Sequence, residues 1–418
     1  MAVSQPEDWH GLEGSAIKDE EEARVLFSAL DSFVRYARTA HFSVTHLRRQ
    51  SFYALPEAHW KMLAAPPFNF LDTLMRTDDA IDSNAELART IARFGLKNFV
   101  HMDVPENPDA DVSLPPRWAG VASHSDIDKA RSTIRQFYRD WTEGGKAERD
   151  ASYDPVIRAL EKETASRAGH KPLNVLVPGA GLGRLVYELC CHGHNTEGNE
   201  ISYHQLAASS YVLNCAKSVN QHTIFPWIHT FSNHPTRDSH LRSYTMPDVH
   251  PASHMRSLRE QGKFVGEMAM CAADFICLYG DDEHKDSYDA VATVFFLDTA
   301  PNLIRYLEVI WHCLKPGGIL INMGPLLWHF ENNAPGNHGK DTDGDGLHES
   351  GTSSGIADPG SFELSDDEVM ALITKIGFTV ESRETGLTAP YITNPDSMLQ
   401  TVYKASTWVA RKPALTSS

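Results

Sequence analysis

The stretch LNVLVPGAGLG at residues 173–183 decides the fold, because a short apolar run ends there in three closely spaced glycines. The amphipathic segment RLVYELCCHG (184–193) follows it, and TEGNE (196–200) with ISYHQLAASSYVLNCAK (201–217) repeats the pattern. Apolar runs that alternate with amphipathic segments are typical of consecutive strands and helices in a parallel sheet. We therefore predict an α/β fold built on a Rossmann-like sheet.

The C-terminal half continues this alternation. Its predicted elements are, in order, a strand at 287–298, a helix at 301–314 that KPGG breaks, and strands at 319–324, 378–384 and 401–411. A further helix is predicted at 365–378, because Ser365 and Glu368 have the spacing of a capping box.

Residues 1–167 are predicted to form a helical N-terminal region, and residues 168–418 a sheet domain. Apolar residues recur at three- and four-residue intervals in the N-terminal region, as in DIDKARSTIRQFYRDW (126–141). Two insertions are expected in the sheet domain. One at 229–262 is rich in His, Pro, Ser and Arg, and the other, at 334–361, is a Gly/Asp/Ser-rich loop.

The composition narrows the classes of partner. The 418 residues carry a formal net charge of −17, which disfavours non-specific binding to nucleic acid or to anionic lipid. No stretch is apolar enough to span a bilayer, and the start MAVSQPEDWHGLEG lacks the features of a signal peptide. The six cysteines lie in apolar segments without metal-binding spacing. We expect a protein of the cytoplasm, the nucleus or both, with no metal, nucleic acid or membrane partner.

The glycines are spaced to bind a nucleoside-containing cofactor. Gly179 and Gly181 let the backbone approach a ligand closely, and the N-terminus of the following helix favours its polar end. Glu200 ends the next strand, where its carboxylate can accept hydrogen bonds from both ribose hydroxyls. Asp274 and Phe275 follow a third predicted strand, so they can bond the adenine amino group and pack against the ring.

Two classes of enzyme share this geometry. A dinucleotide-binding turn reads G-x-G-x-x-G, but Arg184 occupies the position of its last glycine here. S-adenosylmethionine carries no pyrophosphate, so a methyltransferase does not need that glycine. The sequence therefore favours S-adenosylmethionine as the cofactor, with a nicotinamide oxidoreductase as an alternative.

Longer blocks of sequence resemble one family, the carnosine N-methyltransferases. The blocks lie within residues 126–412 and read IRQFYRDWTEGGKAERDASYDPV, VLVPGAGLGRL, EGNEISY, FPWIHTFSN, AADF and FFLDTAPNLIRYLEVIWHCLKPGGILINMGPLLWHFEN. The resemblance implies a class I methyltransferase sheet and the transfer of a methyl group to the imidazole of carnosine or a related histidine-containing peptide. A protein histidine is the alternative substrate.

The resemblance also implies roles for residues around the cofactor. Gln136 and Arg139 match family positions on a helix that closes over it, and Arg139 could bond its methionine carboxylate as a bidentate pair. Further cofactor positions of the family fall on Gly179, Glu200, Asp274, Phe275 and Ala290.

On the substrate side, the resemblance points to Asp298, His329 and Tyr403, with Tyr391 in a matching tyrosine-containing stretch. Asp298 lies just past a strand end, where it can accept the imidazole N–H, stabilise the imidazolium and take the surplus proton. The alternative for Asp298 is the N-cap of the next helix. His329 could bond the same ring or the polar backbone of the substrate.

Several features leave alternatives open. Thr401 departs from the family, which has a tyrosine there, and the insertion at 334–361 interrupts a region that is more compact in animal members. DTDGDG (341–346) resembles the start of a calcium loop, but Thr352 stands where the bidentate glutamate should be. A catalytically silent S-adenosylmethionine-binding protein is a second class of function, and the oligomeric state is open, with a homodimer among the options.

Overall fold

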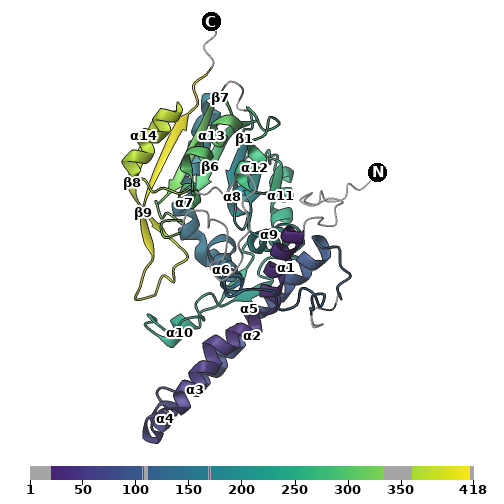
Figure 1. Cartoon of the computed structure of the whole chain (residues 1–418), viewed down its shortest axis with the longest axis vertical. Coiled ribbons are helices and arrows are strands. Elements are labelled where there is room, and N and C mark those ends of the chain that lie inside the picture. Colours follow the sequence, from purple (N-terminus) through teal and green to yellow (C-terminus); the bar gives the residue numbers. More distant parts are fainter. Residues whose placement is uncertain are drawn as a thin grey trace.

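The computed structural model describes residues 20–105, 107, 112–167, 169, 171–333 and 360–414. At its centre lies a seven-stranded sheet with strands in the order β5-β2-β1-β6-β7-β9-β8 (Figure 1). The strands are β1 (Asn174–Pro178), β2 (Asn195–Glu200), β5 (Met268–Ala272), β6 (Tyr288–Val294), β7 (Leu314–Gly324), β8 (Thr379–Pro390) and β9 (Val402–Arg411). The predicted α/β fold with a Rossmann-like sheet is confirmed.

The directions of the strands determine where a ligand can bind. Strands β1, β2, β5, β6 and β7 run parallel, so their carboxyl ends meet at one edge of the sheet. Strand β9 runs antiparallel to both of its neighbours, β7 and β8. The chain order reverses between β1 and β6, and ligands of open α/β sheets bind beyond the carboxyl ends at such a point.

Helices cover both faces of the sheet. Successive residues of a strand point to opposite faces, and accordingly Val175 and Val177 of β1 belong to one hydrophobic core while Leu176 belongs to another. The core of Leu176 is closed by helices that follow the strands along the chain. The helical segments of the sheet domain, apart from 229–262, are α8 (Arg184–Cys191), α9 (Tyr203–Ser210), η3 (Tyr211–Cys215), α12 (Phe275–Tyr279), η4 (Leu297–Thr299), α13 (Leu303–Cys313) and α14 (Asp366–Ile376).

Two of the predicted helix ends can be compared directly with the structure. Helix α14 begins after a capping box between Ser365 and Glu368, as predicted. Helix α13 ends at Cys313, so KPGG, which was predicted to separate helix and strand, lies inside β7. Gly317 in this segment has a φ of +83°, a backbone conformation that favours glycine.

The N-terminal region is helical, as predicted. Its segments are α1 (Glu20–Val34), α2 (Tyr36–Ala40), η1 (His41–His46), α3 (Leu47–Tyr53), α4 (Glu57–Ala64), α5 (Phe70–Asn98), α6 (His124–Trp141), η2 (Glu143–Gly145) and α7 (Lys146–Ser166). Buried residues of α1, α5 and α6 share one core with Val175 and Val177 of β1. The division of the chain at residue 167 stays a prediction.

The two predicted insertions differ in what the structure describes. Residues 229–262 contain α10 (Arg237–His240), β4 (Tyr244–Met246) and α11 (Pro251–Glu260), and β4 pairs with β3 (His222–Ile224) in a separate two-stranded sheet. The insertion predicted at 334–361 lies almost wholly outside the described residues, and so does the calcium-like segment 341–346.

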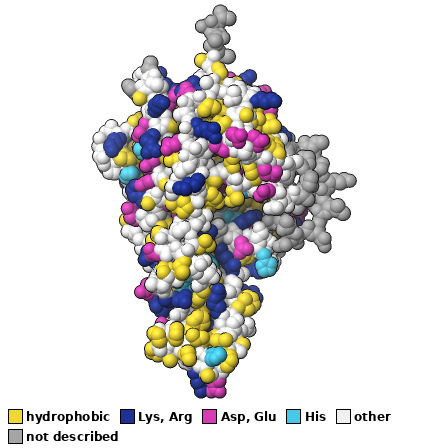
Figure 2. Space-filling view, turned by 90° about the vertical axis from the view of Figure 1, so that its left-hand side faces the viewer, with side chains coloured by type: hydrophobic (Ala, Val, Ile, Leu, Met, Phe, Trp, Pro, Cys, Tyr) yellow, Lys and Arg dark blue, Asp and Glu magenta, His cyan; other side chains and the backbone are white. Residues whose placement is uncertain are grey.

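An arm of helices extends away from the sheet. Helices α3 and α4 form its end (Figure 1), and Figure 2 shows hydrophobic side chains gathered there. The exposed apolar residues of this segment are Phe42, Leu47, Tyr53, Leu55, Met62, Phe68 and Met75. Within the described ranges, no helix combines the length and the apolar character that a membrane crossing requires.

Candidate active site

A cavity of about 300 Å³ opens at the carboxyl edge of the parallel strands. Residues from α6 and α7 line it together with loops that follow β1, β2, β5, β6 and β7. The structure brings together nine of the predicted site residues here, namely Gln136, Arg139, Gly179, Gly181, Glu200, Asp274, Phe275, His329 and Tyr391.

The glycine turn after β1 needs its glycines for two reasons. Gly179, Gly181 and Gly183 have φ values of +68°, +58° and +73°, which L side chains rarely adopt. A Cβ on Gly179 would also lie 2.6 Å from Cδ2 of Phe296, which closes the cavity beside it. The turn therefore forms a narrow cradle that requires glycine at positions 179, 181 and 183.

Glu200 holds this turn against the end of β2. Its Oε2 accepts the Gly181 N–H at 2.9 Å, and its Oε1 accepts the N–H groups of Ile201 and Ser202 at 2.9 and 2.8 Å. Burial raises the pKa of Glu200, although these three bonds act in the opposite direction. A carboxylate has about four lone-pair sites, and the three N–H groups already occupy three of them. If both ribose hydroxyls also donated to Glu200, two of the donors would have to share one lone pair.

Asp274 and Phe275 lie where the loop after β5 meets the cavity. The Oδ1 of Asp274 accepts the N–H groups of Ile276 and Cys277 at 2.9 and 3.0 Å, so this residue caps α12. Phe275 is buried, and its ring contacts Phe296. Both residues also line the cavity, and the capping bonds fix the Asp274 carboxylate at its wall.

Arg139 presents only part of its guanidinium to the cavity. Its Nε and Nη2 donate to Oδ1 and Oδ2 of Asp140 at 2.6 and 3.0 Å. Burial opposes the charge, but the neighbouring Asp140 raises the pKa of Arg139 well above its usual value. The Nη1 group and the other hydrogen of Nη2 are left to form a fork for an anion.

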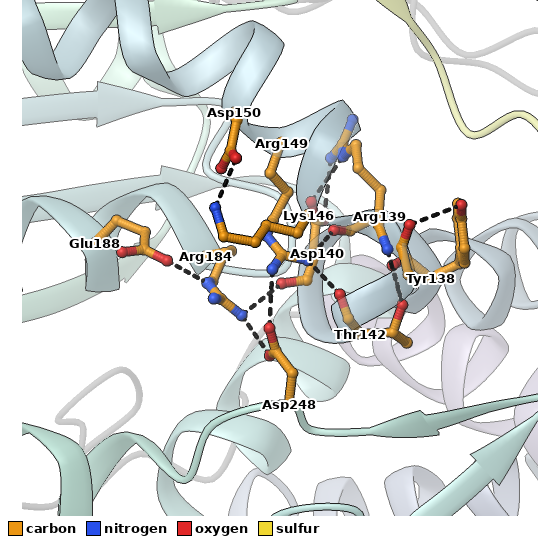
Figure 3. Close-up of polar contacts among 12 residues, drawn as sticks. Tyr138, Arg139, Asp140, Thr142, Lys146, Arg149, Asp150, Arg184, Glu188 and Asp248 are labelled. Atoms are coloured by element: carbon orange, nitrogen blue, oxygen red, sulfur yellow. Dashed lines mark hydrogen bonds and ion pairs between the residues drawn. The ribbon is translucent and has the colours of Figure 1, made fainter.

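Behind Arg139 lies a buried network of alternating charges (Figure 3). Asp248, from the predicted insertion, accepts from Arg149 at 2.8 Å and from Arg184 at 2.6 Å. Arg149 also donates to the Arg139 carbonyl at 2.6 Å, and Arg184 to the Asp140 carbonyl at 3.0 Å. The network therefore fixes the end of α6 against α7, α8 and residues 229–262.

Asp298 and His329 are joined, although they follow different strands. The backbone N–H of His329 donates to the Asp298 carbonyl at 3.1 Å, and the Leu327 N–H donates to Oδ2 of Asp298 at 2.9 Å. Burial raises the pKa of the Asp298 carboxyl, against the Leu327 bond and the charge of His329. His329 is exposed and lines the cavity, whereas Asp298 is buried and does not line it.

Asp298 does not cap the helix that follows it. Asn302 is the N-cap of α13, and its side-chain oxygen accepts the Arg305 N–H. The alternative role for Asp298 that the sequence left open is therefore wrong.

Three aromatic side chains pack together at the end of β6. Phe295 contacts Tyr391 and Tyr403 with ring centroids 5.0 and 6.2 Å apart, and Tyr391 lies 5.5 Å from the Arg139 guanidinium. Phe295 has a φ of +52°, an uncommon conformation for a bulky residue and one that clusters at ligand sites. Tyr403 does not line the cavity itself, but it contacts two residues that do.

Glu148 of α7 fixes the segment that carries Tyr391. Its carboxylate accepts the N–H groups of Ile392 and Thr393. Ile392 has a φ of +44°, which a β-branched residue adopts only when its surroundings impose it. The position of Tyr391 is therefore set by a buried carboxylate of the N-terminal region.

The structure does not place Ala290 at this cavity, and its assignment to the cofactor stays a prediction. Ala290 is fully buried in β6, beside Val175 and Ile319, and it does not line the cavity. The lining begins four residues later at Val294, about 13 Å further along a strand. Sequence reasoning missed several lining residues, namely Ser152, Tyr153, Asn199, Gln205, Phe295, Phe296, Thr299 and Tyr306.

The residues of the cavity fit S-adenosylmethionine. The glycine cradle and the Glu200 carboxylate suit a nucleoside, the Arg139 fork suits a carboxylate, and Phe275 offers an aromatic surface. The sheet has one antiparallel strand, β9, which lies between β7 and β8. This strand order and the cavity together define a class I S-adenosylmethionine-dependent methyltransferase.

Comparison with known proteins identifies the family. The family model of carnosine N-methyltransferase matches residues 116–414. The carnosine N-methyltransferase of Mus musculus is 36% identical over 399 residues, which cover 95% of this chain and 88% of that one. That of Schizosaccharomyces pombe is 34% identical over 395 residues, covering 94% and 97%. The chain belongs to the carnosine N-methyltransferase family.

Among solved structures, an S-adenosylmethionine-dependent methyltransferase of Methanosarcina mazei matches with 15% identity and a TM-score of 0.33. The match covers 58% of this chain and 94% of that one. The fold assignment rests on the order and direction of the strands and not on this overlay.

Proposed function

We propose that this protein transfers a methyl group from S-adenosylmethionine to an imidazole nitrogen of carnosine. The proposal rests on one observation: the same cavity is lined by Glu200 and Arg139, which suit the cofactor, and by His329 on the loop after β7, which suits an imidazole substrate. Membership of the carnosine N-methyltransferase family supplies the substrate.

The cofactor would be held along the carboxyl edge of the sheet. The turn at Gly179 and Gly181 would lie against the middle of the cofactor, between its methionine and its ribose. Glu200 would accept a ribose hydroxyl, and Asp274 with Phe275 would hold the adenine. The free fork of Arg139 would bind the methionine carboxylate. When bound, S-adenosylmethionine supplies an electrophilic methyl group on a sulfonium.

The chain's own contribution is mainly orientation. An imidazole has an ordinary pKa of about 6.5, so much of it is neutral at physiological pH and needs no strong base before it attacks. It needs the attacking nitrogen unprotonated and pointed into the cavity, which requires the other nitrogen to be held through its N–H. His329 at the cavity wall and the aromatic group of Phe295, Tyr391 and Tyr403 would hold the ring.

Asp298 would respond to the charge that develops on the ring. A buried carboxylate stabilises a nearby imidazolium strongly because little water screens it. Burial raises the pKa of Asp298, but its side chain does not line the cavity, so it would act on the ring through space and beside His329 rather than by direct contact. Its bonds to Leu327 and His329 would keep the loop after β7 in place meanwhile.

The direct test is incubation of the purified protein with S-adenosylmethionine and carnosine, followed by mass spectrometry. We expect a singly methylated product with the methyl group on the imidazole. β-Alanylalanine, which lacks the imidazole, is the control and should remain unmodified. A protein that binds the cofactor but methylates only histidines of other proteins would contradict carnosine as the substrate and leave the methyltransferase class intact.

A further inference from the structure

A second cavity, of about 470 Å³, adjoins the first. Helix α6 runs past both of them, because Gln136 and Arg139 line the first cavity while Ser132 and Arg135 line the second. The segment held by Glu148 also passes from one to the other, with Tyr391 lining the first and residues 392–394 the second. The two cavities are therefore neighbouring parts of one surface.

Arg135 is a cation without a partner at the wall of this second cavity. It is exposed and makes no hydrogen bond or ion pair with any residue that the structure describes. Partial burial lowers the pKa of Arg135, and the negative charge of Glu148 acts in the opposite direction. The Glu148 carboxylate is already engaged by the N–H groups of Ile392 and Thr393, so it does not pair with Arg135.

The rest of the lining leaves more donors than acceptors unmatched. Within the described part of the chain, Nε of Arg131, Nε1 of Trp227 and Nδ1 of His229 are buried without a partner. Nδ1 of His234 is also unmatched, and it is an acceptor because Nε2 donates to the Thr230 carbonyl at 2.9 Å. These unmatched N–H groups make the surroundings of the cavity more favourable to an anion than to a cation, but they are buried and do not contact its interior.

The tautomer of His229 follows from its neighbours. The Phe225 N–H donates to Oδ1 of Asn84, which makes Nδ2 of Asn84 the donor to the Tyr36 hydroxyl at 3.1 Å. Tyr36 then donates to Nε2 of His229 at 2.8 Å, so the proton of the ring is on Nδ1. Burial lowers the pKa of His229 to about 3, which keeps the ring neutral, and its unmatched Nδ1 is a donor.

Negative charge is scarce at this cavity, although the whole chain has a net charge of −17. Of the residues that line it, Asp128 is the single carboxylate, and it pairs with Arg131 at 3.2 Å. Arg135 is therefore a positive charge beside the site of methyl transfer that forms no direct ion pair within the described residues, although Glu148 interacts with it at longer range. Such a group selects an anion with acceptor oxygens.

We propose that the second cavity binds the carboxylate of the histidyl substrate, with Arg135 as its main partner. This inference rests on the proposed function, because it places the imidazole of the same molecule in the first cavity. Arg135 and Arg139 are four residues apart on α6, which corresponds to a rise of about 6 Å. Carnosine carries its carboxylate and its imidazole on the same histidine residue, so one molecule would place these two groups in the adjoining cavities.

The test compares carnosine with β-alanylhistamine, which has the same imidazole and amine but no carboxylate. The wild-type protein should methylate carnosine with a kcat/KM roughly 10- to 100-fold higher, the effect of one hydrogen-bonded charge pair. Arg135→Gln should remove most of that preference by raising the KM for carnosine, with little change for β-alanylhistamine. Arg135→Lys, which keeps the charge but not the fork, should retain part of it.

Two controls separate this role from general effects. Arg158→Gln removes a positive charge from α7 at a position that lines neither cavity, so the preference for carnosine should survive. Calorimetry with S-adenosylhomocysteine present should give the same ratios for Kd, independent of turnover. Equal wild-type efficiency on both compounds, or an equal loss on both in Arg135→Gln, would overturn the inference. No methylation of either compound would contradict the proposed function and the inference together.

Discussion

The backbone N–H of His329 donates to the carbonyl of Asp298 at 3.1 Å, which ties the loop after β7 to the loop after β6. The side chain of Asp298 adds a second tie, because its Oδ2 accepts the Leu327 N–H. A change at Asp298 can therefore act through charge or through the position of His329. The two effects can be separated by a substitution that keeps the shape of the side chain.

Asp298→Asn is that substitution. Its amide oxygen can still accept the Leu327 N–H, so the fold and the cofactor affinity should be nearly unchanged. Turnover of carnosine should fall by a factor on the order of 10²–10³, because a preorganised charge near the developing imidazolium is lost. Single-turnover kinetics and calorimetry measure the two quantities. Near wild-type turnover in a folded variant would remove Asp298 from the chemistry and leave it as a tie between loops.

Glu200→Ala should weaken the binding of S-adenosylmethionine by about 1.5–3 kcal/mol, the scale of hydrogen bonds to a charged group. The loss has two sources, because Glu200 also holds the N–H of Gly181 in the glycine turn. Calorimetric titration measures it. Glu197→Gln is a matched control on the same strand, since Glu197 bonds Tyr279 and Tyr288 and does not line the cavity. Unchanged affinity in Glu200→Ala would contradict its assignment to the ribose.

Gly179→Ala should impair cofactor binding through a clash as well as through backbone strain. The added Cβ would lie 2.6 Å from Phe296, and the positive φ alone costs about 1–2 kcal/mol for an L side chain. Gly120→Ala isolates the second effect, because Gly120 has a φ of +84° and nothing within 4 Å of an added Cβ. We expect both variants to lose stability in urea titrations and only Gly179→Ala to lose affinity. Normal affinity in Gly179→Ala would show that the cradle tolerates a side chain.

His194 should make the protein sensitive to acid. Burial, followed by the charge of His192, lowers the pKa of His194 from 6.5 to about 4. The unfolded chain therefore binds a proton between these pH values that the folded chain does not, so stability is present above pH 6.5 and is lost as the pH falls. His194→Leu should reduce this loss by up to about 1.4 kcal/mol for each pH unit in that window. Urea titrations at pH 7 and pH 5 measure it, and equal losses in both proteins would rule this role out.

The sequence predicted the parts of the site that depend on local pattern. The glycine turn, Glu200 at the end of β2 and Asp274 after β5 are each recognisable within one strand and the loop that follows it. Ser152 and Tyr153 were missed because nothing in the sequence of α7 shows that this helix crosses the carboxyl edge of the sheet.

Other features depend on pairings between distant parts of the chain. Arg139 was predicted as a ligand for a carboxylate, but its neighbour Asp140 takes Nε and one hydrogen of Nη2, so only the remaining fork is available. Ala290 was assigned by its place in a matching motif, yet four residues along a strand separate the interior of the sheet from its edge. Neither fact is visible before the fold is known.

The position of Asp248 has an evolutionary consequence. Removing this carboxylate alone would leave Arg149 buried without a counter-charge and Arg184 with Glu188 as its remaining carboxylate partner, which is more damaging than losing the whole group. Lineages that shorten residues 229–262 should therefore replace both arginines as well, and lineages that keep the segment should keep all three. In an alignment of relatives, these positions should covary as a unit, even though none of them lines either cavity.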